Sequence, residues 1–131
     1  MAKSPALQRL APYALAALRI MAALLFIEHG TQKLLGFPPP ANGTLPDAFT
    51  LAWVAGVLEA VGGLLLLLGL FTRPVAFVLS GQMAVAYFMA HAPWNFYPAL
   101  NGGDAAILFC FIFLYLVFAG PGALSLDGRR R

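Results

Sequence analysis

The sequence predicts an all-α membrane protein, a polytopic four-helix bundle with both chain ends in the cytoplasm, and three observations support this prediction. Hydrophobic residues make up 61% of the 131 positions and charged residues only 10%, whereas soluble domains average about 45–50% and 25%. Short segments rich in proline, glycine and aromatic residues divide the chain into four apolar runs. Basic residues gather on one side of those runs. At this length we expect a single domain that covers residues 1–131.

The four predicted spans come close to the roughly 20 residues needed to cross about 30 Å of hydrocarbon. They cover residues 13–35, 49–70, 75–91 and 104–120. Pro12 opens the first span, because the N–H that proline lacks is unpaired at the start of a helix anyway. The proline-rich residues 37–47 and the aromatic residues 92–103 form two long loops. Residues 71–74 form a turn so short that the second and third spans must be antiparallel neighbours.

The distribution of basic residues orients the chain in the membrane. Six flank the termini or the middle turn and one borders the opposite side; the six are Lys3, Arg9, Arg73, Arg129, Arg130 and Arg131, and the one is Lys33. The positive-inside rule therefore places both termini in the cytoplasm and the two long loops outside the inner membrane of a bacterium. Because the net charge of +3 comes largely from these flanks, we expect the lipid membrane as a partner and not nucleic acid.

The first predicted span carries many polar residues for a membrane helix. Arg19, Glu28, His29 and Lys33 lie within it, and a charge at mid-membrane costs roughly 2.5–3.5 kcal/mol on insertion scales. At about 100° per residue, Arg19 and Lys33 share one face, with His29 at its edge and Glu28 opposite. Such side chains face a protein interior or a wet cavity. For Lys33 a simpler alternative to an interior position is that its long aliphatic side chain places the ammonium group at the outer membrane interface.

Glu59 is the single charge of the second span. It lies about ten residues from either end, too deep for a short carboxylate to reach water. We expect Arg19 or His29 as its partner, and we assign Arg19 and Glu59 to buried charge pairing. Two interpretations remain open: an ion pair that fixes the bundle, or an acid that carries a proton or binds a ligand in a cavity.

Polar residues from all four spans converge on the outer half of the predicted bundle. These candidate ligand-binding residues are His29, Lys33, Glu59, His91, Asn101 and Asp104. For Asp104 the simpler role is an N-cap of the fourth span, where its carboxylate accepts hydrogen bonds from free N–H groups. The convergence predicts a polar pocket that opens outward, although no residue is identified as catalytic.

Neither metal nor haem is expected. His29 and His91 lack the spacing and supporting residues of a ligand set. Cys110 is the single cysteine, so the chain holds no internal disulfide and no CxxC motif. Among apolar neighbours we expect Cys110 to act as a small buried hydrophobe.

Short motifs recur in order along nearly the whole chain, with one polar element for each helix. They are Arg19, Phe26, His29-Gly30 and Lys33-Leu34; Glu59, Gly62-Gly63, the run Leu67 to Leu70 and Thr72-Arg73; Asn101 to Asp104; and Gly120 to Gly122 with Ser125 to Asp127. Together they resemble the pattern of the DoxX family. The resemblance implies a four-helix integral protein of the bacterial inner membrane. It also implies an association with quinone-linked oxidoreductases, since the family is named after membrane subunits of sulfur-compound oxidation and has relatives linked to redox partners.

Three functions follow from these observations. The first is a quinone-interacting or membrane-anchoring component of an oxidoreductase system, and so at most a subunit of an enzyme, with quinone as the ligand. The second is a structural or assembly subunit whose buried charges only fix packing, with association into homo-oligomers as an open option. The third is a carrier of small solutes or protons that uses Glu59.

Overall fold

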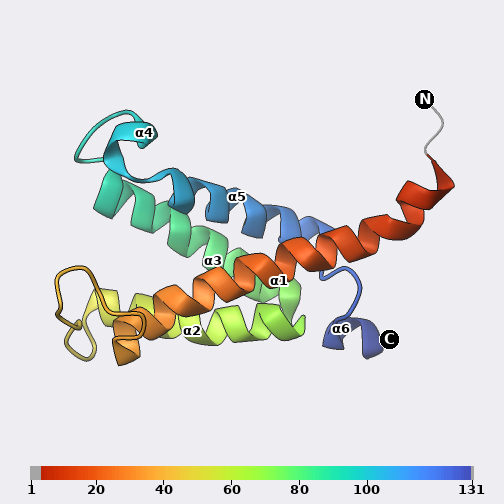
Figure 1. Cartoon of the computed structure of the whole chain (residues 1–131), viewed down its shortest axis with the longest axis horizontal. Coiled ribbons are helices and arrows are strands. Elements are labelled where there is room, and N and C mark those ends of the chain that lie inside the picture. Colours follow the sequence, from red (N-terminus) through yellow and green to blue (C-terminus); the bar gives the residue numbers. More distant parts are fainter. Residues whose placement is uncertain (1–3, 131) are drawn as a thin grey trace.

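A computed structural model describes residues 4–130 of the chain, and all regular structure in that range is helical (Figure 1). Four long elements form the body. The helices are α1 (Pro5–Leu35), α2 (Leu51–Leu68), α3 (Thr72–Ala86) with its π-helical continuation η1 (Tyr87–His91), α4 (Pro98–Asn101), α5 (Asp104–Ala119) and α6 (Leu126–Arg129). The all-α class predicted from the sequence is confirmed.

Three of these elements are long and apolar enough to cross a membrane: α1, α2, and α3 together with η1. Helix α5 has 16 residues and is almost entirely apolar, but it is shorter. Large apolar side chains point outward along the body, including Phe77, Val85, Leu108 and Phe118, which are all more than half exposed. Such a surface is suited to lipid.

The first helix begins earlier than predicted. Pro5, not Pro12, occupies the first turn of α1, and Pro12 lies inside the helix. Both prolines suit the first turn of a helix, so the sequence alone does not choose between them. As a result α1 extends well past the other helices at its N-terminal side (Figure 1).

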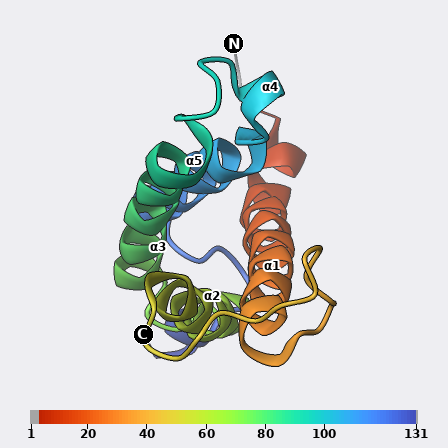
Figure 2. The ribbon, with the colours of Figure 1, turned by 90° about the vertical axis from the view of Figure 1, so that its left-hand side faces the viewer.

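The bundle consists of two antiparallel hairpins, α1 with α2 and α3 with α5, as the end-on view shows (Figure 2). Glycines allow the first pair to approach closely. A Cβ atom on Gly30 would lie 2.5 Å from the backbone nitrogen of Ala60, and one on Gly63 would lie 2.7 Å from Ile27. This contact fixes the register of α1 against α2.

The hydrophobic core fills the half of the bundle that faces the ends of α2 and α5. Phe26 and Phe113 pack edge to face there, with ring centroids 4.9 Å apart. Leu66 and Leu79 are fully buried beside them. The opposite half, where α1 ends and α5 begins, contains the pocket described below. We call it the pocket end, and the other the C-terminal end.

Residues 120–130 fold back across the C-terminal end and are held there by Arg19. The guanidinium of Arg19 donates hydrogen bonds to the carbonyl oxygens of Pro121, Ala123 (3.2 Å) and Leu124 (2.9 Å). The Arg19 side chain is 0% exposed. The predicted pairing of Arg19 with Glu59 is therefore wrong, because the charge of Arg19 is solvated by backbone carbonyls of the C-terminal segment.

Arg73, in the first turn of α3, also stabilises the C-terminal end. It donates hydrogen bonds of 2.8 and 2.7 Å to the carbonyl oxygens of Val117 and Phe118, in the last turn of α5. These carbonyls have no partner inside the helix, and a cation complements the negative end of the helix dipole. Arg73 thus caps α5.

Asp127 connects α6 to the start of α3. Its carboxylate accepts hydrogen bonds of 2.9 Å from the backbone N–H groups of Phe71 and Thr72. Partial burial raises the pKa of Asp127, but these hydrogen bonds and the charge of Arg130 outweigh it and hold the pKa below its ordinary value of 3.8. Asp127 is therefore an ionised cap of α3.

Candidate ligand-binding site

The charge at Glu59 is paired with Lys33. The ammonium nitrogen of Lys33 lies 2.6 and 2.8 Å from the two carboxylate oxygens of Glu59. Gln82 of α3 donates a weaker hydrogen bond of 3.3 Å to Glu59 Oε1. Glu59 is 3% exposed, whereas the Lys33 side chain is 32% exposed. The ion pair thus has one buried partner and one that reaches open space.

The expectation that Arg19 or His29 pairs with Glu59 is wrong for a geometric reason. With Gly30 packed on Ala60, Lys33 lies on the α1 turn that faces Glu59. Arg19 is 11 residues before Gly30, about 16 Å away along the helix axis. Lys33 does not extend to the interface as the alternative interpretation held, because its ammonium group turns inward to Glu59.

A pocket of about 280 Å³ lies beside this ion pair, between α1, α2, α3 and α5. Four of the six residues predicted from the sequence line it: His29, Lys33, Glu59 and His91. Their convergence from three different elements is therefore seen in the structure. The other two, Asn101 and Asp104, do not line the pocket, although their neighbours Gly102 and Ala105 do.

A π-helical turn brings His91 to the pocket. The Ala92 N–H donates to the carbonyl of Tyr87, five residues back, with a distance of 2.9 Å. Such turns occur mostly at functional sites, because the additional residue re-aims the side chains. His91 Nδ1 lies 3.0 Å from the Asn101 carbonyl oxygen. A carbonyl can only accept, so Nδ1 carries the proton and a neutral His91 leaves Nε2 as an acceptor.

Asn101 is buried and holds the loop that precedes α5. Its amide nitrogen donates to the hydroxyl of Tyr87 (3.2 Å) and the carbonyl of Asn95 (2.9 Å). Its amide oxygen accepts from the Gly103 N–H at 2.8 Å. With these bonds made inside the loop, Asn101 positions His91 and does not face a ligand.

Asp104 lies on the surface as the first residue of α5. The N-cap position that the sequence assigned to it is occupied by Gly103. In the first turn of the helix the Asp104 carboxylate still complements the positive end of the helix dipole.

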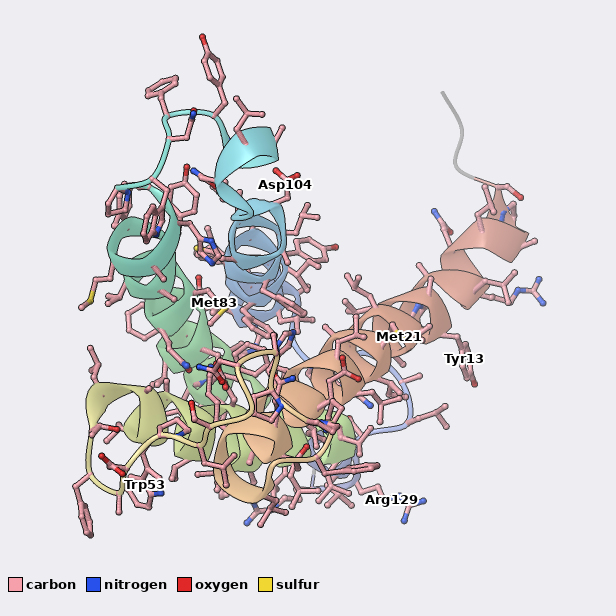
Figure 3. The ribbon with its side chains drawn as sticks, turned by 60° about the vertical axis from the view of Figure 1, so that its left-hand side comes forward. Tyr13, Met21, Trp53, Met83, Asp104 and Arg129 are labelled. Carbon is pink, nitrogen blue, oxygen red and sulfur yellow. The ribbon has the colours of Figure 1, made fainter. Side chains whose placement is uncertain are left out.

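The wall of the pocket toward the core is apolar and aromatic. Phe26 and Phe109 have ring centroids 5.4 Å apart, and His29 meets the edge of Phe109 with centroids 6.4 Å apart. Met83 reaches the same space and points from α3 to the interior of the bundle (Figure 3). Sequence analysis missed Phe109 and Met83, because apolar side chains on apolar helices carry no distinctive signal.

Within residues 4–130, no group of three or more His, Cys, Asp or Glu side chains is arranged to hold a metal ion. Cys110 is half-buried on α5 and its carbonyl accepts a 2.8 Å hydrogen bond from Ser80. It packs against the core cluster and does not line the pocket.

Comparison with known families decides what kind of membrane protein this is. The model of the DoxX family matches residues 14–92, which include α2, α3, η1 and most of α1. The chain belongs to the DoxX family. The matched range contains Arg19, the Lys33–Glu59 pair and both pocket histidines.

Relatives of this DoxX chain align over nearly its whole length. A protein of Haemophilus influenzae that is named only as uncharacterized is 50% identical over 129 residues, covering 94% of this chain and 95% of that one. The inner membrane protein YphA of Escherichia coli is 30% identical over 131 residues, covering 90% and 91%. An uncharacterized membrane protein of Mycobacterium tuberculosis is 27% identical over 133 residues, covering 90% and 82%. No solved structure matches the chain.

The site of this DoxX-family membrane protein combines three chemical features. It has a cation, Lys33, that is held by a buried carboxylate but remains partly accessible. It has a histidine with a fixed proton on Nδ1 and a free acceptor on Nε2. It has an aromatic wall that suits a flat ring. This arrangement can bind a planar molecule that carries polar oxygens at its edge.

Proposed function

We propose that this DoxX-family protein binds the ring of a quinone in the pocket beside Lys33, as the membrane component of an oxidoreductase system. One observation carries the proposal: an ion pair with an accessible cation lies in a pocket that two histidines and apolar side chains complete, and the cation is on a helix of membrane-spanning length. Ionisable groups at such depth are functional candidates by default.

The proposal includes an orientation in the bacterial inner membrane. Helix α5 packs along α3, and its 16 residues have an axial length of about 24 Å, so we propose that it is a fourth span. Arg9, Arg73 and Arg129 lie at the C-terminal end of the bundle, where the positive-inside rule puts the cytoplasm. The pocket then opens to the outer side, and the name of the Escherichia coli relative supports the choice of membrane.

The residues of the pocket fit a quinone ring. A volume of about 280 Å³ is at the small end of ligand pockets, enough for a single ring and not for a whole lipid. Lys33 donates hydrogen bonds and offers positive charge to a ring carbonyl, and Phe26 and Phe109 offer a flat contact. A bound quinone would supply the redox chemistry by accepting electrons from a partner enzyme.

The chain's own contribution is to bind, orient and supply protons. Glu59 accepts hydrogen bonds from the Lys33 ammonium group and so orients it, and Gln82 donates a hydrogen bond to the Glu59 carboxylate. His91 holds one proton on Nδ1 against the Asn101 carbonyl and presents the other nitrogen as an acceptor or, when charged, as a donor. Lys33 and His91 are therefore the groups that we assign to contact with the ring oxygens.

Quinone content tests this proposal. The protein is purified in mild detergent, and quinones and associated proteins are measured by mass spectrometry per mole of folded protein. We expect Lys33→Met and His91→Ala to lose most of the quinone that the unmodified protein retains. Glu28→Gln is the matched control, because Glu28 is a charged residue on the same helix as Lys33 that does not line the pocket. Equal content in all four proteins would refute the proposal.

A structural role is the second candidate, and the same ion pair favours it. Lys33 and Glu59 join α1 to α2 within the glycine-mediated contact, so the pair can act to fix register alone. In that case the double variant Lys33→Met/Glu59→Leu should fold, assemble and retain the same partners as the unmodified protein. Loss of quinone or of a redox partner from a folded double variant would contradict this role.

A further inference from the structure

An apolar groove runs along the outside of the bundle between α1 and α5. It has a volume of about 240 Å³ and is lined by Met21 and Leu25 of α1 and by Leu108 and Ile112 of α5, among others. Every side chain that lines it is apolar. The two helices approach each other only weakly along this side, in contrast to the close contact between α1 and α2.

The groove adjoins the polar pocket. Ala105 and Phe109 line both, so these two residues form the wall between the groove and the pocket with His29 and Lys33. Ala105 is small and exposed in this wall. A polar compartment inside the bundle thus lies next to an apolar channel on its surface.

We propose that this groove holds the isoprenoid tail of the quinone whose ring occupies the pocket, and that the ligand enters sideways from the membrane between α1 and α5. This inference rests on the proposed function and adds the substrate class: quinones with a prenyl tail, in preference to tailless ones. A polar compartment next to an apolar channel matches a polar ring joined to a hydrocarbon chain. The groove lies where a tail would already reside, in the hydrocarbon layer.

A second surface groove provides the comparison. It lies between α2 and α3, is larger at about 400 Å³, and is also lined by apolar side chains such as Leu58 and Val61. It shares no lining residue with the polar pocket. General lipid chains can fill both grooves, but only the groove between α1 and α5 can hold a chain attached to a ring in the pocket.

The tail contributes by close packing and not by escape from water, since it leaves one apolar medium for another. The expected gain is therefore moderate, on the order of tenfold in retention, the equivalent of about 1.4 kcal/mol.

The test compares ligands that share one ring and differ in the tail. The full chain in lipid nanodiscs is loaded with a ubiquinone ring bearing no tail, a short prenyl tail or a long one, each at a fixed mole fraction. Occupancy is measured for the unmodified protein and for Leu25→Trp, which narrows the groove. Leu58→Trp is the matched control, because Leu58 is 36% exposed and Leu25 is 42% exposed.

We expect tailed quinones to be retained about tenfold better than the tailless ring by the unmodified protein. Leu25→Trp should remove this advantage and leave binding of the tailless ring unchanged, because Leu25 lines the groove and not the pocket, and Leu58→Trp should change neither. If the tailless ring binds in a Lys33-dependent way but the tail adds nothing, or if Leu25→Trp and Leu58→Trp act alike, this inference fails and the proposed function stands. If no ring binds to any of the proteins, the proposed function fails as well. Phospholipid that is lost from Leu25→Trp without loss of quinone would show a lipid groove and overturn the inference.

Discussion

The two ends of the bundle hold buried cations in opposite ways. At the C-terminal end the Arg19 guanidinium is 0% exposed and donates to three backbone carbonyls of the folded-back segment. At the pocket end Lys33 pairs with one carboxylate, and its side chain keeps 32% of its surface open to a cavity. Both residues belong to the same helix and, by sequence, to the same face.

The difference indicates that Arg19 stabilises the fold and that Lys33 can bind a ligand. A planar guanidinium with several donors can satisfy several carbonyls at once, which suits a fixed junction. An ammonium on a flexible stem can exchange one partner for another, which suits a site where a ligand arrives. The Arg19 side chain has no exposed surface and does not line the pocket, whereas the Lys33 side chain lines it.

The largest effect is expected from Arg19→Leu. It leaves three carbonyl oxygens without this donor in a partly buried junction, and each group that stays buried and unsatisfied costs about 1–3 kcal/mol. We expect the free energy of unfolding to fall by roughly 3 kcal/mol or more, measured by thermal melting in one detergent. Arg9→Leu is the control on the same helix, because Arg9 is exposed. Equal melting temperatures for the two variants would show that the C-terminal junction does not depend on Arg19.

The next effect concerns the two glutamates, Glu59 and Glu28. Glu59→Gln removes the charge that holds Lys33, so we expect a loss of about 1–2 kcal/mol, less than for a fully buried pair because Lys33 can turn to the cavity. Glu28→Gln should change stability little, since the Glu28 carboxylate makes no ion pair or hydrogen bond within the described residues 4–130. Melting curves of both variants check this.

Adding Lys33→Met to Glu59→Gln tests whether the pair acts as a unit. If it does, the double variant should be no less stable than Glu59→Gln alone. Fully additive losses would mean that Lys33 and Glu59 stabilise the bundle separately.

Much of the fold could be predicted from the sequence, but the partners of the buried charged residues could not. Apolar runs and proline-rich breaks were enough to predict an all-helical membrane chain. The partner of Glu59 depended on the register of two helices, which a single contact between Gly30 and Ala60 decides. The partners of Arg19 are backbone carbonyls more than a hundred residues away, and a carbonyl has no side-chain signature.

The candidate site shows the same limit. His29, Lys33, Glu59 and His91 could be grouped because charged or titratable residues are rare in membrane helices. Asn101 was grouped with them but does not line the pocket, because its hydrogen bonds hold the loop before α5 and sequence position does not reveal which way an amide points.

A smaller effect distinguishes the loop from the pocket. Asn101→Ala removes hydrogen bonds that hold residues 95–103 together. Hydrogen exchange in this loop should therefore become faster, because the free energy of opening the loop falls by about 1 kcal/mol. Lys33→Met should leave exchange in the loop unchanged and lower quinone content. Mass spectrometry of exchanged peptides measures the first effect. Slow exchange in an Asn101→Ala protein would show that the loop is held by other contacts.

The smallest effect is a pH dependence at the C-terminal end. The pKa of Asp127 is lower in the folded protein than its ordinary value of 3.8, because the ionised carboxylate accepts from Phe71 and Thr72 and lies near Arg130. A depressed pKa gives stability that is fully present above pH 3.8 and is lost as the pH falls through the folded pKa. Replacing Asp127 with Asn removes the charge and one of the two acceptors, and a negative charge at a helix N-terminus contributes about 0.3–1 kcal/mol. We therefore expect Asp127→Asn to have a lower melting temperature than the unmodified protein at pH 6 in detergent. The difference in melting temperature should shrink as the pH is lowered below 4.

Comparing the two proteins at each pH cancels the titration of the other carboxylates. A difference in melting temperature that is constant over this range, or that grows toward low pH, would show that the charge of Asp127 does not hold α6 to α3.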